Sequence, residues 1–170
     1  MLVKQRRTIT VDHIDQILAQ WQKERPDLDT WPMAPIGRMY RLFHHLAGEI
    51  EKVHKQGGLK TGEFDVLATL RRSGAPYRLT PTALFQSAML SSGAMTNRLN
   101  QLEKRGLISR IPAEEDRRSL LVQLTDSGIA LIDTLVEAHL EKERELLSAL
   151  NKEQQASLDH LLQDWLRNFE

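Results

Sequence analysis

The chain has 170 residues, 41% of them hydrophobic, which is enough for one domain or for one subunit of an intertwined dimer. It lacks cysteine, a long apolar run and a signal-peptide pattern. This excludes disulfides and thiolate metal sites, and we expect a cytoplasmic protein without a membrane partner. Its 23 Lys and Arg residues equal its 23 Asp and Glu residues, and this balance does not by itself point to nucleic acid.

The first 34 residues are expected to form a basic arm, one helix and a linker. The arm, residues 1–9, is interpreted either as a solvated tail or as a segment that contacts phosphate. The helix is predicted to be capped by Thr10, to end near Pro26 and to carry Trp21 on its apolar side. Trp21 is either a core anchor for this helix or the wall of a ligand pocket, because indole offers a flat face and one N–H donor.

A long helix with a wide apolar face is predicted from about Ile36 to Lys55. His45 and Glu49 have the i, i+4 spacing of a metal pair, but no third ligand is evident, so no metal or cofactor is expected. The alternative is that the histidines of this helix face solvent or a second subunit. They are His44, His45 and His54.

The next helix, predicted to be capped by Thr61, is apolar around much of its circumference. Asp65 lies in it and is therefore a candidate for partial burial, in which case its carboxylate needs a cation or several donors. The same pattern allows Asp65 to share a wet face with Thr69 and Arg72.

Two shorter helices and a hairpin follow. Thr80 and Pro81 predict a helix start, and a second helix is expected from Ser91 or Ser92 to Gly106. The apolar stripe of this second helix consists of Met95, Leu99 and Leu102.

The opposite face of the second helix is small and amide-rich. Amide side chains can read adenine edges, and a small helix start can approach a phosphate.

Strand-like segments at 107–111 and 120–124 flank a charged tip that contains Asp116, Arg117 and Arg118. A helix-turn-helix followed by a basic-tipped hairpin predicts a winged helix-turn-helix, mainly α with a small β-hairpin wing. One helix would enter the major groove and the wing would enter the minor groove.

The C-terminal part is expected to form two helices, capped by Thr125 and Asn151. The last helix gathers apolar residues on one side, which must be buried, most simply against another subunit. Charge is divided unevenly: residues 91–124 hold six basic and four acidic residues, whereas residues 137–170 hold four basic and eight acidic ones. The apolar residues of the last helix are Leu158, Leu161, Leu162, Trp165, Leu166 and Phe169.

Several of these motifs resemble the MarR family of bacterial transcription regulators. The resemblance runs from about Pro35 to the C-terminus and is carried by SSGAMTNRLNQLEKRGLISR, DRRS and LVQLTDSG. Its specific part is the D-x-R wing of Asp116 and Arg118, followed by a strand and by L-T-x-x-G, which ends at Gly128. The run DHIDQILAQWQKERPDLDTWPM is similar to the PecS-type, urate-responsive branch of that family, which has an extra N-terminal helix.

This resemblance implies an organisation and a set of DNA contacts. Residues 35–58 and 126–170 would dimerise two chains into an intertwined homodimer, residues 59–125 would form the DNA-binding domain, and residues 1–34 would supply the arm and the extra helix. The expected partner is double-stranded DNA with a pseudo-palindromic operator. The expected DNA-binding residues are Ser92, Ala94, Thr96, Asn97, Asn100, Asp116, Arg117 and Arg118.

The PecS-type resemblance also implies a pocket for a small aromatic anion such as urate, lined by Trp21, Asp65, Arg98 and Arg110. Arg98 flanks the apolar side of the recognition helix rather than its DNA side.

The expected function is a ligand-responsive regulator that represses transcription. The alternative is a winged-helix adaptor that binds proteins instead of DNA, which the neutral net charge would fit. The sequence contains neither a nucleophile elbow nor a phosphate loop nor H-E-x-x-H, so we do not expect an enzyme.

Overall fold

The computed structural model of the chain describes residues 11–88, 95–113 and 120–170. The chain divides into two compact units, residues 1–47 and 48–170, and the boundary falls inside helix α2 (Met33–Gln56). Within the described ranges, every helix is too short or too polar to span a bilayer.

The first unit holds α1 (His13–Glu24) and the first part of α2. The predicted cap at Thr10 is wrong. Asp12 caps α1, because its carboxylate accepts from the backbone N–H of Asp15, and the Asp15 carboxylate accepts from the N–H of Asp12. The predicted start of α2 at Ile36 is also too late, since the helix begins three residues earlier and Pro35 lies in its first turn, where proline is tolerated.

α1 packs on α2 through one close contact and one ionic cluster. Ile14 is buried and lies against Gly37, where a Cβ would come within 2.9 Å of its Cδ1. The Arg38 guanidinium donates to Asp12 at 2.7 Å and to Asp15 at 2.5 Å. The carboxylates that cap α1 therefore also bind α2.

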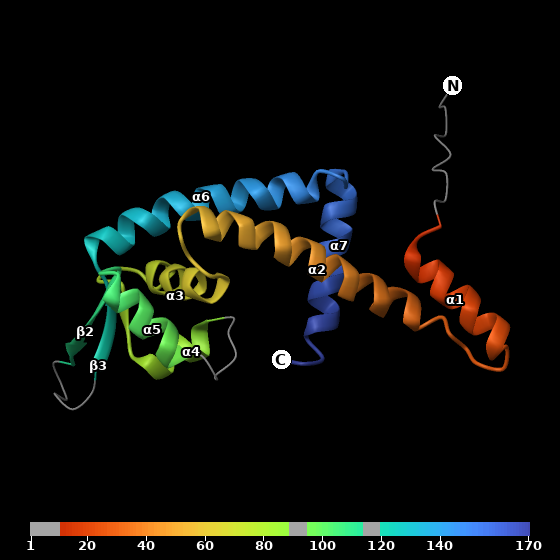
Figure 1. Cartoon of the computed structure of the whole chain (residues 1–170), viewed down its shortest axis with the longest axis horizontal. Helices are drawn as coiled ribbons and strands as arrows, with labels where there is room; N and C mark the ends of the chain where they lie inside the picture. The colour runs from red at the N-terminus through yellow and green to blue at the C-terminus, as the bar shows by residue number, and fades with distance from the viewer. Residues whose placement is uncertain (1–10, 89–94, 114–119) are drawn as a thin grey trace, which may run out of the picture. The chain divides into compact units, whose positions relative to one another are not determined.

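The second unit combines helices with a small sheet (Figure 1). The helices that follow α2 are α3 (Thr61–Arg72), α4 (Pro81–Ser87), α5 (Met95–Lys104), α6 (Asp126–Leu147) and α7 (Lys152–Leu166). In Figure 1, α3, α4 and α5 lie together beside the hairpin, and α7 leaves from the far end of α6. The arrangement is mainly helical, with a wing-like hairpin after the helix pair, as the sequence predicts.

The sheet has three antiparallel strands in the order β1-β3-β2. β2 (Ile108–Pro112) and β3 (Leu120–Leu124) form the predicted hairpin, and its tip lies outside the described residues. β1 (Arg78–Leu79) was not predicted, because a strand of two residues has no period to read. It exists through its pairing with Gln123 and Val122 of β3.

The core of this unit joins all its elements except α7. The predicted stripe of α5 is buried, with Leu102 at 0%, Leu99 at 4% and Met95 at 8% exposure. Burial of this stripe leaves Asn97 and Asn100 on the solvent side of α5. The other core residues are Val53, Leu59, Phe64, Val66, Leu67, Leu70, Leu84, Leu107, Ile108, Val122, Leu124, Ile132 and Leu135.

The start of α6 is fixed on the turn between α5 and β2. Thr125 caps α6 as predicted: its hydroxyl accepts from the N–H of Gly128 at 3.0 Å and donates to the carbonyl of Gly106 at 2.7 Å. A Cβ on Gly128 would overlap the carbonyl group of Leu107, whose carbon would lie 3.0 Å away. The glycine of L-T-x-x-G is therefore required by this close approach.

The histidines of α2 have different environments. His44 and His45 are exposed, as expected, but His54 is buried at 1% exposure, which the sequence did not predict. The His54 ring stacks on Phe64 with centroids 4.0 Å apart, and its Nε2 lies 3.1 Å from His139 Nδ1. Burial, with a further contribution from the charge of His139, lowers the pKa of His54 to about 4.

Candidate nucleic-acid interface and effector site

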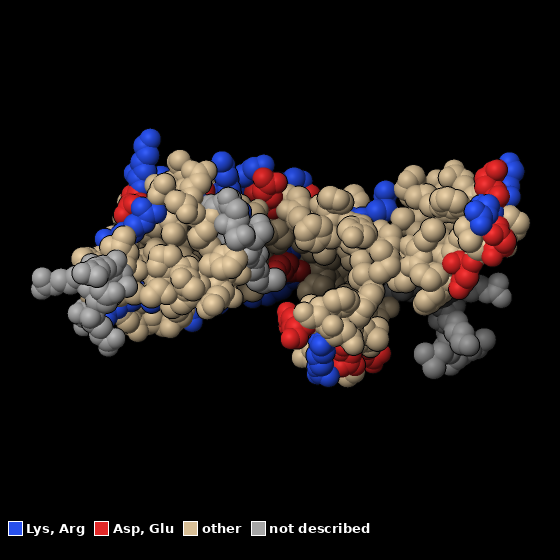
Figure 2. Space-filling model, turned by 90° about the horizontal axis from the view of Figure 1, so that it is seen from below, with Lys and Arg blue, Asp and Glu red and all other residues tan. Residues whose placement is uncertain are grey.

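The solvent side of α5 is the candidate reading surface. Thr96, Asn97 and Asn100 are exposed on it, whereas Ser92 and Ala94 lie outside the described residues. The wing residues Asp116, Arg117 and Arg118 lie outside them as well. In Figure 2, uncharged atoms cover most of the winged-helix part, and Lys and Arg side chains lie at its edge. This arrangement suits base contacts at the centre and phosphate contacts at the rim.

Asn100 is held by a side chain of the hairpin. Arg110, on β2, donates from Nη2 to Asn100 Oδ1 at 2.7 Å and from Nη1 to Glu103 Oε2 at 2.9 Å. Its side chain is 26% exposed, so this bridge between hairpin and helix is partly shielded from water. The hairpin therefore orients the exposed amide of Asn100.

Arg98 occupies the other side of α5. It is half-buried, and its guanidinium lies against Gly62 of α3, where a Cβ would be only 2.7 Å from Arg98 Cζ. Its Nη1 is fully enclosed and has no hydrogen-bond partner in the described part of the chain. An enclosed guanidinium N–H without a partner is costly, and a ligand acceptor would satisfy it.

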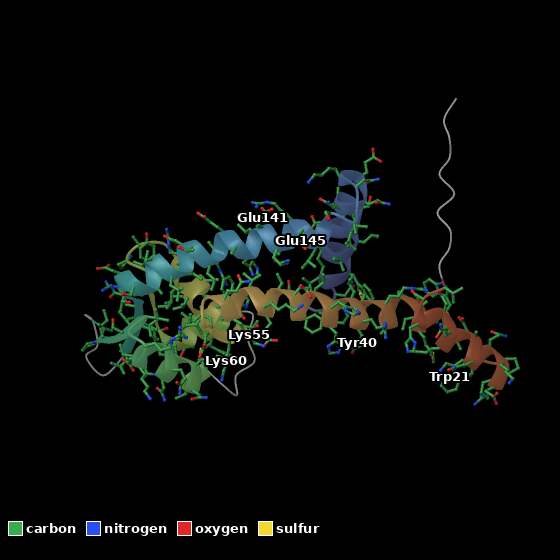
Figure 3. The ribbon with its side chains drawn as sticks, turned by 45° about the horizontal axis from the view of Figure 1, so that its top comes forward. Trp21, Tyr40, Lys55, Lys60, Glu141 and Glu145 are labelled. Carbon is green, nitrogen blue, oxygen red and sulfur yellow. The ribbon has the colours of Figure 1, made fainter. Side chains whose placement is uncertain are left out.

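Asp65 lies near Arg98, as a partly buried carboxylate requires. Burial raises the pKa of Asp65, and the positive charge of Arg98 acts against that shift. The structure thus brings together Asp65 and Arg98, and not Arg110, which pairs with Glu103 and Asn100 instead. Trp21 lies in the first unit, on α1, where it is 41% exposed (Figure 3).

Arg105 is a positioning residue that the sequence analysis missed. At the end of α5 its Nη1 donates to the carbonyl of Gly58 at 2.9 Å and lies 3.6 Å from the buried carboxylate of Glu63. Glu63 also accepts from the N–H of Lys60, which caps α3 in place of the predicted Thr61. A basic residue directly after the last turn of a helix was the available signal, but it does not specify this partner.

Each unit exposes an apolar surface among its described residues in the single chain. α7 is capped by Asn151 as predicted, and its apolar side is open: Trp165 is 40% exposed, and Phe169, just after the helix, is 77% exposed. In the first unit, α2 exposes Tyr40, which Figure 3 labels, at 68% and Phe43 at 65%. Surfaces of this kind mark sites of protein association.

Among the described residues, no group of three or more His, Cys, Asp or Glu side chains is placed to hold an ion. His139 Nε2 pairs with Glu143 at 3.1 Å.

The three-stranded sheet, the α4–α5 pair and the amide side chains on the open face of α5 define a winged helix-turn-helix protein. The model of the MarR family matches residues 59–120. The HTH-type transcriptional regulator PecS of Dickeya dadantii (strain 3937) is 44% identical over 149 residues, which cover 88% of this chain and 90% of PecS. The chain belongs to the MarR family of transcription regulators and is similar to PecS over most of its length.

Solved structures have the same fold. A mutant MarR from E. coli complexed with operator DNA superposes with a TM-score of 0.69 at 22% identity, over 86% of this chain and 97% of that one. BpsR of Bordetella bronchiseptica, whose DNA binding is regulated by 6-hydroxynicotinic acid, superposes with a TM-score of 0.67 at 20% identity. That match covers 76% of this chain and 90% of BpsR.

Proposed function

We propose that this protein binds a pseudo-palindromic operator as a homodimer, represses transcription and releases the DNA when a small aromatic anion, with urate as first choice, binds near Arg98. The observation that carries the proposal is the position of Arg98. It belongs to α5, the candidate reading helix, and it has an enclosed N–H without a partner among the described residues. A ligand that satisfies this group would contact the reading element directly.

DNA reading is assigned to α5 and the wing. The exposed amides of Asn97 and Asn100 match major-groove edges. Arg118 would enter the minor groove, oriented by Asp116, and Arg117 would contact phosphate. Two copies related by a two-fold axis would place their helices in half-sites about one turn, ~10 bp, apart. The operator-bound relative from E. coli supports this partner.

Dimerisation is assigned to residues 35–58 and 126–170, with 59–125 as the DNA-binding domain and 1–34 as the arm and extra helix. The exposed apolar side of α7 supports this division, because a second copy would cover it.

Removing residues 152–170 tests the assembly. It should give monomer or aggregate in light scattering and abolish specific DNA binding. A stable truncated dimer would show that α7 is not essential.

The effector would act by shifting the equilibrium between two conformations of the protein. An anion on Arg98 would repel the nearby carboxylate of Asp65, and the proposal is that this repulsion favours an arrangement in which α5 has moved. Coupling requires that the ligand binds this arrangement better than the DNA-bound one. The aromatic acid that regulates BpsR supports this ligand class, and the sequence resemblance to the urate-responsive branch of the family is the reason for choosing urate. Trp21 would stack on the ring, and Arg110 would add a second cation after leaving its bonds to Glu103 and Asn100.

The test is a gel shift with DNA from upstream of the protein's own gene, followed by titration with urate. Wild type should bind and release, Arg118→Ala should bind weakly, and Arg117→Ala should lower the salt slope by roughly one.

Trp21→Phe, Asp65→Ala and Arg98→Ala should respond less to urate when compared at equal initial occupancy. Failure of wild type to bind DNA would favour the alternative, a protein-binding adaptor that the zero net charge fits. Binding that ignores urate would refute the effector alone.

A further inference from the structure

We propose that Arg110 determines which base Asn100 reads. By occupying the amide oxygen of Asn100, Arg110 makes this side chain present N–H donors to the DNA and so favours guanine over adenine. The inference rests on the proposed DNA reading by α5, and it assigns Arg110 a role in specificity in addition to any contact with an effector.

The orientation of the Asn100 amide follows from chemistry. A guanidinium has only donors, so the amide atom that faces Arg110 at 2.7 Å must be the oxygen. The NH2 group of Asn100 is then directed away from Arg110. Because Asn100 is exposed on the side of α5 opposite Leu99 and Leu102, these two donors are available to a partner outside the protein.

Arg110 is itself held in place. Glu103 accepts from Nη1 at 2.9 Å while Asn100 accepts from Nη2, so the planar fork spans one turn of α5. The backbone beneath it is fixed by pairing of Arg110 with Val122 in the centre of the hairpin. Lysine cannot reproduce this bridge, because its ammonium is a single point of contact without a planar fork.

The bound oxygen changes the base preference. Asparagine reads adenine by accepting from N6 and donating to N7, so it needs its oxygen. Guanine instead presents two acceptors, O6 and N7, in the major groove. An asparagine whose oxygen is engaged by Arg110 therefore matches guanine, whereas a free asparagine matches adenine.

The experiment selects binding sequences from a randomised DNA pool with full-length wild type, Arg110→Met, Asn100→Ala and Lys104→Met. Met keeps much of the length of arginine without its donors. Lys104 is exposed one turn further along the same helix, so Lys104→Met removes an equal charge beside Asn100 but leaves the bond between Arg110 and Asn100 in place. Thermal melting of each variant checks that it is folded. A double variant with both Arg110→Met and Asn100→Ala measures whether the two residues act together.

We expect Asn100→Ala to lose preference at one position of each half-site, where wild type selects guanine. Arg110→Met should change preference at that same position towards adenine, with an effect of roughly tenfold, and at no other position. Lys104→Met should weaken binding to all sequences equally. In the double variant the effects should not add.

Two results would overturn the proposal, and they are distinguishable. If Arg110→Met keeps the wild-type preference at the position that Asn100→Ala abolishes, Arg110 does not set the base, although α5 still reads DNA. If Asn100→Ala changes preference nowhere, α5 does not read through Asn100, and the proposed DNA contact fails together with this inference.

Discussion

Replacing Gly62 by alanine should weaken effector binding while leaving the stability of the fold nearly unchanged. A methyl at this position would meet the guanidinium of Arg98, with Cζ only 2.7 Å from an ideal Cβ. Ordinary contact distances require Arg98 to retreat by roughly 1 Å. The backbone of α3 accepts alanine, which gains up to about 1 kcal/mol over glycine in a helix. Since the obstacle is the end of a flexible side chain, the free energy of unfolding should change by less than about 1 kcal/mol.

The effect of Gly62→Ala on affinity for the anion should be larger than its effect on the free energy of unfolding. An Arg98 displaced from the pocket loses its charge-assisted bond to the anion, which is worth about 1.5–3 kcal/mol or roughly 10- to 150-fold in affinity. Moving its charge from Asp65 should also raise the pKa of that carboxyl further above its ordinary value.

Calorimetric titration with urate measures the first effect, and NMR titration of the Asp65 carboxyl measures the second without any ligand. Unchanged affinity together with an unchanged Asp65 pKa would refute the placement of Arg98. A wild type that does not bind urate would refute the ligand but leave the Asp65 measurement valid.

Two further predictions concern stability. Gly128→Ala should lower the free energy of unfolding by about 1–3 kcal/mol in urea melts, unlike Gly62→Ala, because the new methyl would overlap the Leu107 backbone, which cannot turn aside. An unchanged urea midpoint would show that α6 can shift at no cost. Acid should destabilise the protein through His54, whose pKa is lowered from 6.5 to about 4 in the folded state. Between these two pH values the unfolded chain binds a proton at His54 and the folded chain does not. Stability from this source is complete above pH 6.5, is lost as the pH falls towards 4, and amounts to about 3 kcal/mol. His54→Gln should flatten the dependence of the urea midpoint on pH over that range. Equal slopes for the two proteins would contradict the burial of a neutral His54 beside His139.

The elements and the class of this protein were readable from the sequence because their signals are local. The period of Met95, Leu99 and Leu102 predicted the buried side of α5, and therefore also its open amide side. Thr80 and Thr125 cap their helices as expected, since a side-chain cap depends only on the residues that follow it. The motifs after Pro112 placed the chain in its family for the same reason.

Tertiary structure decided the contacts between elements. His54 lies on the same helix as His44 and His45, and only the packing of α3 and α6 on its end buries it. Arg110 carried the same sequence-based expectation as Arg98. Strand pairing nevertheless placed Arg110 over Asn100. The packing of α5 on α3, with the Arg98 guanidinium against Gly62, placed Arg98 near Asp65.

Helix periods and caps follow from the order of neighbouring residues, so the sequence alone predicted the helices and the buried side of α5, although α1 and α3 begin at other caps than predicted and β1 was missed. The partner of a charged side chain depends on distances between segments far apart in the chain. Only the fold could therefore decide that Arg110 binds both Glu103 and Asn100, whereas Arg98 keeps an N–H without a partner among the described residues.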